Sequence, residues 1–296
     1  MPELLLQQVA GNTYYIPSPT NVGVYLAGRE AILIDSGSDE EAARQILRAL
    51  QKNELTLRLI INTHSHADHI GGNLFLQKRT GCAIAATPEE AALIENTGLE
   101  TAILYGGYPL AGLHNKFLHA KPATVQHRIG AAGPILDTGL EALPLPGHSG
   151  GMIGVRTPDR VLFLADSLLA PRVIEKYHLF YLWDVEAHLR TLTALPSLAA
   201  DLLIPSHTQP LTDLRETIRL NKAKIEEIAA SLRDICRTAV NTEEIFQQIC
   251  RKYAVALNTN GYVLGMSTVR SYLAYLENQN VIEHFFDEEQ LKWRVK

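Results

Sequence analysis

The stretch LRLIINTHSHADHIGGN, residues 57–73, decides the fold class that we predict for this chain of 296 residues. Its first part, LRLIIN, is a mostly apolar run of the kind found in strands that are buried on both faces. Four potential metal ligands follow within six residues: His64, His66, Asp68 and His69. In sheets flanked by helices, functional side chains commonly follow the C-terminal ends of strands. We therefore expect a buried strand that carries a chemically active loop.

Neighbouring segments repeat this alternation of strand and helix. Residues 21–35, NVGVYLAGREAILID, predict a β-hairpin, and residues 38–41, SDEE, predict a capping box that opens a helix. Residues 82–86, CAIAA, predict another strand, and TPEE at 87–90 predicts a second capped helix with Pro88 at its first position. The alternation places the first half of the chain in the α/β class.

Later strand-like runs end close to three more potential ligands, namely His148, Asp166 and His207. The runs are PILDTGLEALPLPG, VLFLAD and DLLIP. Together with a predicted helix over residues 185–200, they complete a catalytic domain that we expect to span residues 1–212. Within it, residues 97–128 lack periodicity and are too long for a routine connection. We expect this insertion to act as a lid over the site or as a contact in a homodimer.

Residues 213–296 predict a small helical C-terminal domain. A long amphipathic helix begins at Leu214. A helix over 242–253, a loop containing Gly261 and Gly265, a helix over 267–279 and a final hairpin follow it. This order resembles a winged-helix module.

Composition limits the function classes. With 46% hydrophobic and 20% charged residues the chain is an ordinary globular protein, and its net charge of −5 does not favour a nucleic-acid partner. Residues 241–296 carry six Lys or Arg against seven Asp or Glu, whereas a nucleic-acid reader needs a basic stripe. Three widely spaced cysteines indicate a reducing compartment. The N-terminal residues resemble neither a signal peptide nor a membrane span, so we expect a cytoplasmic protein without a membrane partner.

The ligand cluster favours a catalytic metal site. Imidazoles and carboxylates suit zinc, iron or manganese, whereas structural zinc sites usually rely on sulfur. Alternating ligands on a tight loop can point to two different metals, which the i, i+4 spacing of a helical site would not allow. Gly71 and Gly72 would let the backbone turn closely after the ligands.

The whole set of motifs resembles the metallo-β-lactamase superfamily. The matching segments are HSHADH at 64–69, PGHSGG around His148, FLADS around Asp166 and IPSHT around His207. The resemblance implies a four-layer αββα sandwich with two divalent metal ions, zinc being the first choice, at one edge between two sheets. It also implies one metal on His64, His66 and His148, a second on Asp68, His69 and His207, and Asp166 as the bridge.

The expected reaction is hydrolysis. Two cations roughly 3.5–4 Å apart can share a hydroxide, lower its pKa towards ~7 and stabilise developing charge. We therefore expect a metal-bridging hydroxide to attack a small ester, thioester or lactone carbonyl, with Asp68 as a catalytic residue as well as a ligand. Two alternatives remain open: a phosphodiesterase such as the β-lactamase-like endoribonucleases, which have a similar C-terminal part, and a non-catalytic interaction protein on the same fold.

The motif is also reminiscent of the glyoxalase II-like branch, but the C-terminal part lacks the basic cluster that would hold a glutathione carboxylate. Aromatic residues are the candidate walls of a substrate pocket: Tyr105, Tyr108, Tyr177, Phe180, Tyr181 and Trp183. The remaining histidines are given no role: His114, His119, His127, His178, His188 and His284.

Overall fold

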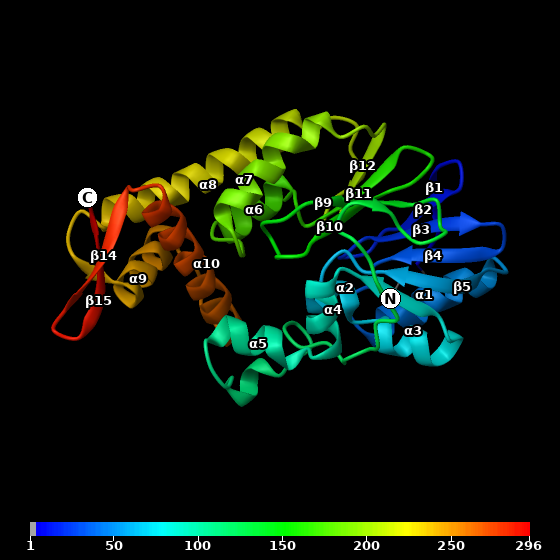
Figure 1. Cartoon of the computed structure of the whole chain (residues 1–296), viewed down its shortest axis with the longest axis horizontal. Coiled ribbons are helices and arrows are strands. Elements are labelled where there is room, and N and C mark those ends of the chain that lie inside the picture. Colours follow the sequence, from blue (N-terminus) through cyan, green and yellow to red (C-terminus); the bar gives the residue numbers. More distant parts are fainter. Residues whose placement is uncertain (1–3) are drawn as a thin grey trace.

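The computed structural model describes residues 4–296 and contains two large sheets that face each other (Figure 1). The first sheet has seven strands, in the order β1 (Gln7–Ala10), β2 (Thr13–Ile16), β3 (Val22–Ala27), β4 (Glu30–Ile34), β5 (Thr56–Ile61), β6 (Ala83–Ala86) and β7 (His127–Arg128). The second has five, in the order β12 (Leu202–Pro205), β11 (Val161–Ala165), β10 (Ile153–Arg156), β9 (Glu141–Pro144) and β8 (Gly133–Pro134).

Helices cover the outer face of each sheet (Figure 1). The first sheet is covered by α1 (Glu40–Lys52), α3 (Asn73–Thr80) and α4 (Pro88–Glu95), and the short α2 (Ala67–Ile70) precedes α3. The second sheet is covered by α6 (Pro171–Tyr177), α7 (Val185–Ala194) and α8 (Arg215–Ile235). The predicted four-layer αββα sandwich is therefore confirmed.

Strand residues alternate between two hydrophobic layers. In β4, Leu33 packs under the first helical layer, whereas Ile32 and Ile34 pack between the sheets. In β11, Leu162 packs towards the second helical layer and Phe163 packs between the sheets. Because successive side chains of a strand point to opposite faces, a strand covered on both sides needs apolar residues throughout. This explains the continuous apolar runs of the sequence.

The C-terminal part adds α9 (Thr242–Lys252), α10 (Thr259–Asn278) and a three-stranded sheet in the order β13 (Val240–Asn241), β15 (Gln290–Val295) and β14 (Ile282–Asp287). Its apolar residues form one continuous cluster with those of α6, α7 and the second sheet. The order of elements along the chain is the one expected of a winged-helix module. Both that assignment and the domain boundary at residue 212 stay predictions.

Several predicted details differ from the structure. Asp39, and not Ser38, caps α1, because its side chain accepts a hydrogen bond from the Ala42 amide. The expected loop around Gly261 and Gly265 lies inside α10, which begins eight residues earlier than predicted, after the cap at Asn258. The irregular 97–128 segment contains the helix α5 (Gly98–Tyr105) and the 3₁₀ turn η1 (Ala111–Leu113).

The helix predicted after Thr87 is confirmed as α4, with Pro88 at its first position, but its predicted side-chain cap is wrong. Thr87 makes no side-chain cap, and its hydroxyl instead donates to the Gly151 carbonyl at 3.0 Å. The Glu90 side chain turns away from the helix start and into the protein, where it is 1% exposed. Thr87 and Glu90 match the pattern of a helix cap, but their side chains bond to the neighbouring loops instead.

The strand ends bring the ligand loops together. A Cβ on Gly72 would lie 2.3 Å from the Ser36 carbonyl oxygen, so the loop after β4 can pass directly over the start of α3. Gly71 and Gly72 are needed for this close approach of another segment. Their backbone conformation does not require glycine, because their φ angles of −58° and −87° are ordinary right-handed values. Ala165, at the end of β11, has φ of 49°, an uncommon conformation for a non-glycine residue that precedes Asp166.

Candidate metal centre

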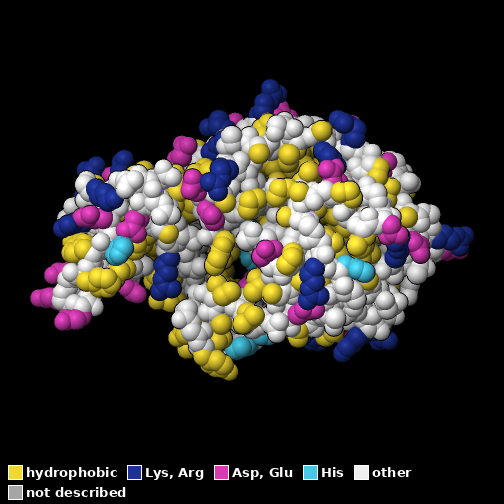
Figure 2. All heavy atoms as spheres, viewed as in Figure 1, with side chains coloured by type: hydrophobic (Ala, Val, Ile, Leu, Met, Phe, Trp, Pro, Cys, Tyr) yellow, Lys and Arg dark blue, Asp and Glu magenta, His cyan; other side chains and the backbone are white. Residues whose placement is uncertain are grey.

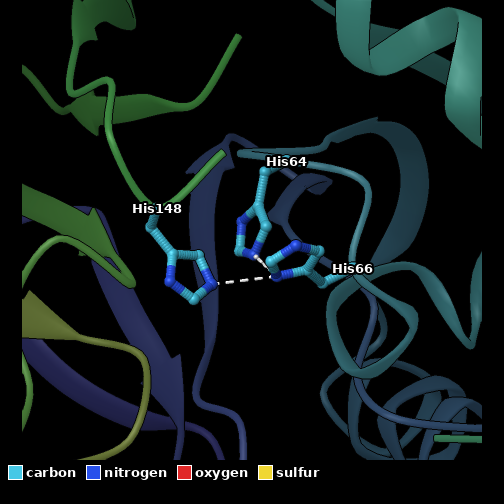
Figure 3. Close-up of side chains that lie close together, drawn as sticks. All are labelled: His64, His66 and His148. Carbon is cyan, nitrogen blue, oxygen red and sulfur yellow. Dashed lines mark hydrogen bonds between the residues drawn. The ribbon is translucent and has the colours of Figure 1, made fainter. Parts of the chain in front are cut away.

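Three histidines converge on one point (Figure 3). His64 Nε2 lies 3.1 Å from His66 Nδ1, and His148 Nε2 lies 2.9 Å from the same His66 atom. His64 and His66 follow β5, whereas His148 comes from the loop between β9 and β10. Two segments on different sheets thus bring the predicted first triad together.

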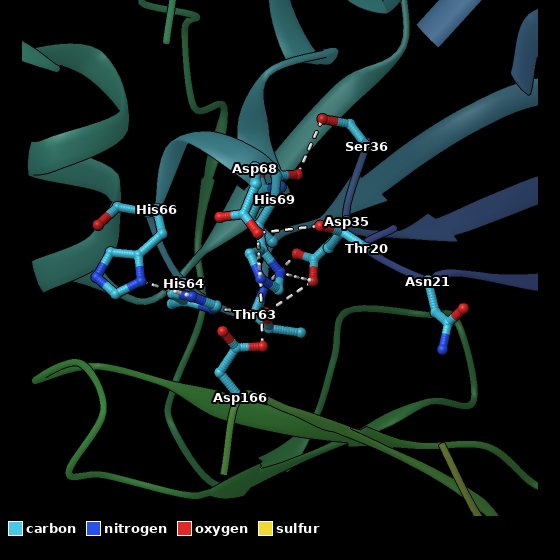
Figure 4. A network of polar contacts seen from close by, with 12 residues as sticks. Thr20, Asn21, Asp35, Ser36, Thr63, His64, His66, Asp68, His69 and Asp166 are labelled. Carbon is cyan, nitrogen blue, oxygen red and sulfur yellow. Dashed lines mark hydrogen bonds and ion pairs between the residues drawn. The ribbon is translucent and has the colours of Figure 1, made fainter. Parts of the chain in front are cut away.

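The remaining predicted ligands form a second group beside the first, and Figure 4 shows three of them, Asp68, His69 and Asp166, next to His64 and His66. Asp68, His69 and His207 offer donor atoms that all lie within 4.8 Å of one another. Asp166 lies between the two groups: its Oδ1 is 3.4 Å from His69 Nε2, and its Oδ2 is 3.4 Å from His148 Nε2 and 3.3 Å from His207 Nε2. All seven predicted ligands therefore share one site.

Outer hydrogen-bond partners orient the ring nitrogens that face away from the centre. His148 Nδ1 donates to the Tyr181 carbonyl at 3.2 Å, and His207 Nδ1 donates to the Pro19 carbonyl at 2.8 Å. His69 Nδ1 donates to Asp35 Oδ2 at 2.8 Å. Because each of these outward nitrogens carries a proton, the Nε2 atom of each ring presents a lone pair to the centre whenever the ring is neutral, as metal binding requires.

His64 and His66 also have partners for the ring nitrogens that face away from the centre. Thr63 Oγ1 donates to Asp35 Oδ2 at 2.8 Å, so it accepts from His64 Nδ1 at 3.0 Å (Figure 4). His66 Nε2 lies 3.6 Å from Glu100 Oε1 on α5. The inward atoms are therefore His64 Nε2 and His66 Nδ1. Outer partners of this kind fix the tautomer and orientation of metal-bound histidines.

This arrangement fits a bound cation. Three unprotonated ring nitrogens that face one another repel unless a proton or a metal lies between them. Burial lowers the pKa of His66 to about 3, with the neighbouring His148 adding to the effect, and burial likewise lowers the pKa of His64 and of His148. Two buried atoms that point into the centre, His69 Nε2 and Asp166 Oδ1, also lack a hydrogen-bond partner in the described part of the chain.

In the second group, carboxylates raise the pKa of the histidines, whereas burial lowers the pKa of the histidines in the first group. Asp166 raises the pKa of His207 to about 9. Burial alone would lower the pKa of His69, but Asp166, Asp68 and Asp35 together raise it well above the usual value. Burial would raise the pKa of Asp166, yet His207 and His69 hold it well below the usual range. Imidazole nitrogens and carboxylate oxygens form a donor set for zinc, iron or manganese.

Two buried acids that sequence analysis missed hold the ligand loops in place. Asp35, at the end of β4, accepts from the Thr63 amide, the Thr63 hydroxyl and His69. Glu90 accepts from the Ser65 amide at 2.8 Å, from the Gly151 amide at 2.9 Å and from the Ser149 hydroxyl. Asp35 had a usable signal, since an acid ending the buried run AILID needs partners. Glu90 had none, because its position also suits a helix cap.

A cavity of about 280 Å³ opens beside the first triad. Of the six predicted pocket aromatics, Tyr181 and Trp183 line it. Phe180 is buried in the hydrophobic core, and Tyr177 is half-exposed beside Lys176. Tyr105 and Tyr108 are exposed and do not line the cavity, although they belong to the segment that borders it. Within residues 4–296, we find no helix that combines the length and apolar character needed to cross a membrane.

Comparisons with solved structures agree with this fold. A solved β-lactamase domain protein from Burkholderia ambifaria matches with a TM-score of 0.74 at 18% identity, covering 98% of this chain and 93% of that one. A metallo-β-lactamase family protein from Thermus thermophilus matches with a TM-score of 0.69 at 19% identity, covering 100% and 99%. At such identities these likenesses concern the fold.

Sequence relatives point to the same family. A protein named hydroxyacylglutathione hydrolase from Methylococcus capsulatus is 28% identical over 50% of this chain and 48% of its own length. The chain spans about half the length of the first curated relatives that it matches. The family model of the metallo-beta-lactamase superfamily matches residues 15–207, which include all seven predicted ligands. The chain therefore belongs to the metallo-beta-lactamase superfamily.

Proposed function

We propose that this protein is a metal-dependent hydrolase that cleaves a small ester, thioester or lactone. The observation that carries the proposal is the convergence of seven donor atoms in two groups that share Asp166, with the outward nitrogen of each ligating histidine facing a defined partner. The relatives named hydroxyacylglutathione hydrolase support the hydrolytic class.

Divalent metal ions are the implied cofactors, and we propose two of them. His64, His66 and His148 would hold one, and Asp68, His69 and His207 would hold the other, with Asp166 between them. Zinc is our first choice, with iron or manganese as alternatives for the same donor set. When bound, the metals would polarise the carbonyl and lower the pKa of water.

The chain's own residues would orient the reactants. The Thr20 hydroxyl donates to Asp68 Oδ2 at 3.0 Å, which fixes one oxygen of that carboxylate. The Asp68 side chain is 40% exposed, in contrast to Asp166 at 8%, so its other oxygen can reach an incoming molecule. We propose that Asp68 both binds metal and accepts a hydrogen bond from the attacking water. A fixed acceptor within hydrogen-bond reach of the reacting proton is what general-base action requires.

The test is a panel assay on one metal-analysed preparation of the full chain. Thioesters, esters, lactones and phosphodiesters would be offered to protein loaded with zinc, iron or manganese, before and after treatment with a chelator. We expect turnover of at least one class of carbonyl substrate, loss of turnover on chelation and recovery when metal is restored. Activity confined to phosphodiesters would overturn the proposal in favour of the nuclease alternative, and turnover that survives complete metal removal would also overturn it.

A further inference from the structure

The cavity beside the first triad has a composition that restricts its ligand. Its apolar and aromatic walls are Leu93, Ile103, Leu104, Tyr181 and Trp183. The Tyr181 ring lies 5.4 Å from the His66 ring and 5.7 Å from the His148 ring, measured between ring centroids. A group in this cavity would therefore be the part of a substrate next to the reacting carbonyl. The cavity volume of about 280 Å³ is at the small end of ligand pockets.

Apart from His66, the ionisable side chains that line the cavity are acidic. Glu89, Glu90 and Glu100 line it, and none of the described lining residues is Lys or Arg. Glu90 is compensated by three hydrogen bonds from the ligand loops. The Glu89 side chain is exposed and makes no hydrogen bond or ion pair within residues 4–296. A carboxylate placed here would meet like charge in a largely apolar setting, which is unfavourable. Figure 2 shows a hollow near the centre of this face, with hydrophobic and acidic side chains around it.

Long-range contacts hold one wall of the cavity in place. Leu104 on α5 packs with Leu113 and Leu118 against Val263 of α10. Asn115 and Asn260 exchange side-chain hydrogen bonds of 3.0 and 3.3 Å. Tyr181 and Leu264 of α10 pack against the same cluster. The C-terminal part therefore supports the pocket wall that α5 and Tyr181 provide.

We infer that this cavity binds a short, uncharged apolar acyl group and disfavours one that carries a carboxylate. The inference rests on the proposed function and narrows its substrate class. A glutathione moiety, with its two carboxylates, does not suit this cavity. Under this proposal the C-terminal part contributes to substrate selection by supporting the cavity wall. That role does not require nucleic-acid binding.

The test uses N-acetylcysteamine thioesters with the metal-loaded full chain. Across acetyl, butanoyl and hexanoyl thioesters we expect kcat/KM to rise about threefold per methylene until the cavity is filled. Succinyl thioester matches butanoyl in length but ends in a carboxylate, and we expect it to react at least about tenfold more slowly. Turnover with no dependence on chain length, or succinyl at or above the rate of butanoyl, would overturn the inference.

Two variants test the residues directly. Glu89→Lys should raise the ratio of succinyl to butanoyl rates by about threefold or more, whereas Glu226→Lys, the same charge change on an exposed position of α8, should leave the ratio unchanged. Ile103→Trp should fill the cavity and remove the gain from butanoyl to hexanoyl, while Leu99→Trp on the same helix should not. Circular dichroism would verify that each variant folds.

A binding measurement separates this inference from the proposed function. Non-hydrolysable S-hexyl and S-(5-carboxypentyl) analogues of N-acetylcysteamine, which match in carbon number, would be titrated while the fluorescence of Trp183 is followed in a Trp293→Phe background. Tighter binding of the hexyl analogue without turnover of any thioester would refute the proposed function and support the cavity assignment. Equal binding of the two analogues, or tighter binding of the charged one, would refute the cavity assignment whatever the turnover.

Discussion

The metal centre and the cavity beside it differ in how far apart their residues lie in the sequence. Four of the seven predicted ligands lie within residues 64–69, and the others follow strand ends. The cavity is lined by side chains from α4, α5, the loop after β9 and residues 181–183, and its wall is supported by α10. The centre is polar and each ligand histidine has an outward partner, whereas the cavity is mostly apolar. Under the two proposals above, the reaction class depends on a local motif, and substrate choice depends on long-range packing.

The largest expected effect comes from the centre itself. Asp68→Asn removes the carboxylate that we propose as both ligand and hydrogen-bond acceptor, so kcat/KM should fall by at least about a hundredfold. Steady-state kinetics and metal analysis of the same preparation would measure it, with Asp213→Asn, an exposed position outside the site, as the control. A metal-replete Asp68→Asn enzyme with more than a tenth of the parent activity would contradict the assignment.

Glu100 belongs to both regions, and its replacement should produce the next largest effect. It lines the cavity and lies 3.6 Å from His66 Nε2. Glu100→Gln should weaken metal binding by about tenfold to a hundredfold, because outer partners of metal-bound histidines have effects of that size. Competition with a chromophoric chelator would measure this. Glu89→Gln, in the same cavity but without a contact to His66, should bind metal as the parent does, and equal affinities in all three proteins would show that Glu100 serves the cavity alone.

A buried histidine near the centre should affect acid stability. His188 on α7 is 1% exposed, and neither ring nitrogen has a hydrogen-bond partner among the described residues. Burial lowers its pKa to about 3, with His148 adding to the effect. His188 of the unfolded chain therefore binds a proton as the pH falls below about 6.5, whereas His188 of the folded chain stays unprotonated until the pH approaches 3. The stability contribution is complete above pH 6.5 and is lost as pH falls towards 3, by up to about 1.4 kcal/mol per pH unit.

The check is the His188→Leu variant, which cannot titrate. Chemical denaturation between pH 7 and 4.5 should show a smaller loss of unfolding free energy than in the parent. His188→Asn, which removes the titration but retains polarity, should show the same reduced pH slope at lower absolute stability. Parallel slopes for the parent and both variants would mean that His188 binds a proton as readily in the folded protein as in the unfolded chain.

Sequence patterns could predict the layers and the ligand set because both depend on short-range signals. Two segments show this clearly: the apolar run before His64 and the run VLFLAD, which ends in Asp166. Each is a buried strand followed directly by a polar residue. Glu90 and Glu100 were not predictable, since their partners lie on the loop after His148 and on His66, and nothing in their own segments indicates those contacts. The start of α10 was missed because Gly261 and Gly265 suggest a loop, whereas Phe246 lies so close to Gly265 that a Cβ there would be 2.7 Å away.

The smallest effect should come from the contact that joins the cavity wall to the C-terminal part. Asn260→Ala removes two side-chain hydrogen bonds with Asn115, at a cost of about 1 kcal/mol. If the cavity depends on this support, KM for a hexanoyl thioester should rise about fivefold while kcat and metal content stay unchanged. Asn278→Ala, at the exposed end of the same helix, should alter neither parameter. A fall in metal content with Asn260→Ala would mean that the centre and the cavity form one cooperative unit, and the separation between local chemistry and long-range selection would not hold.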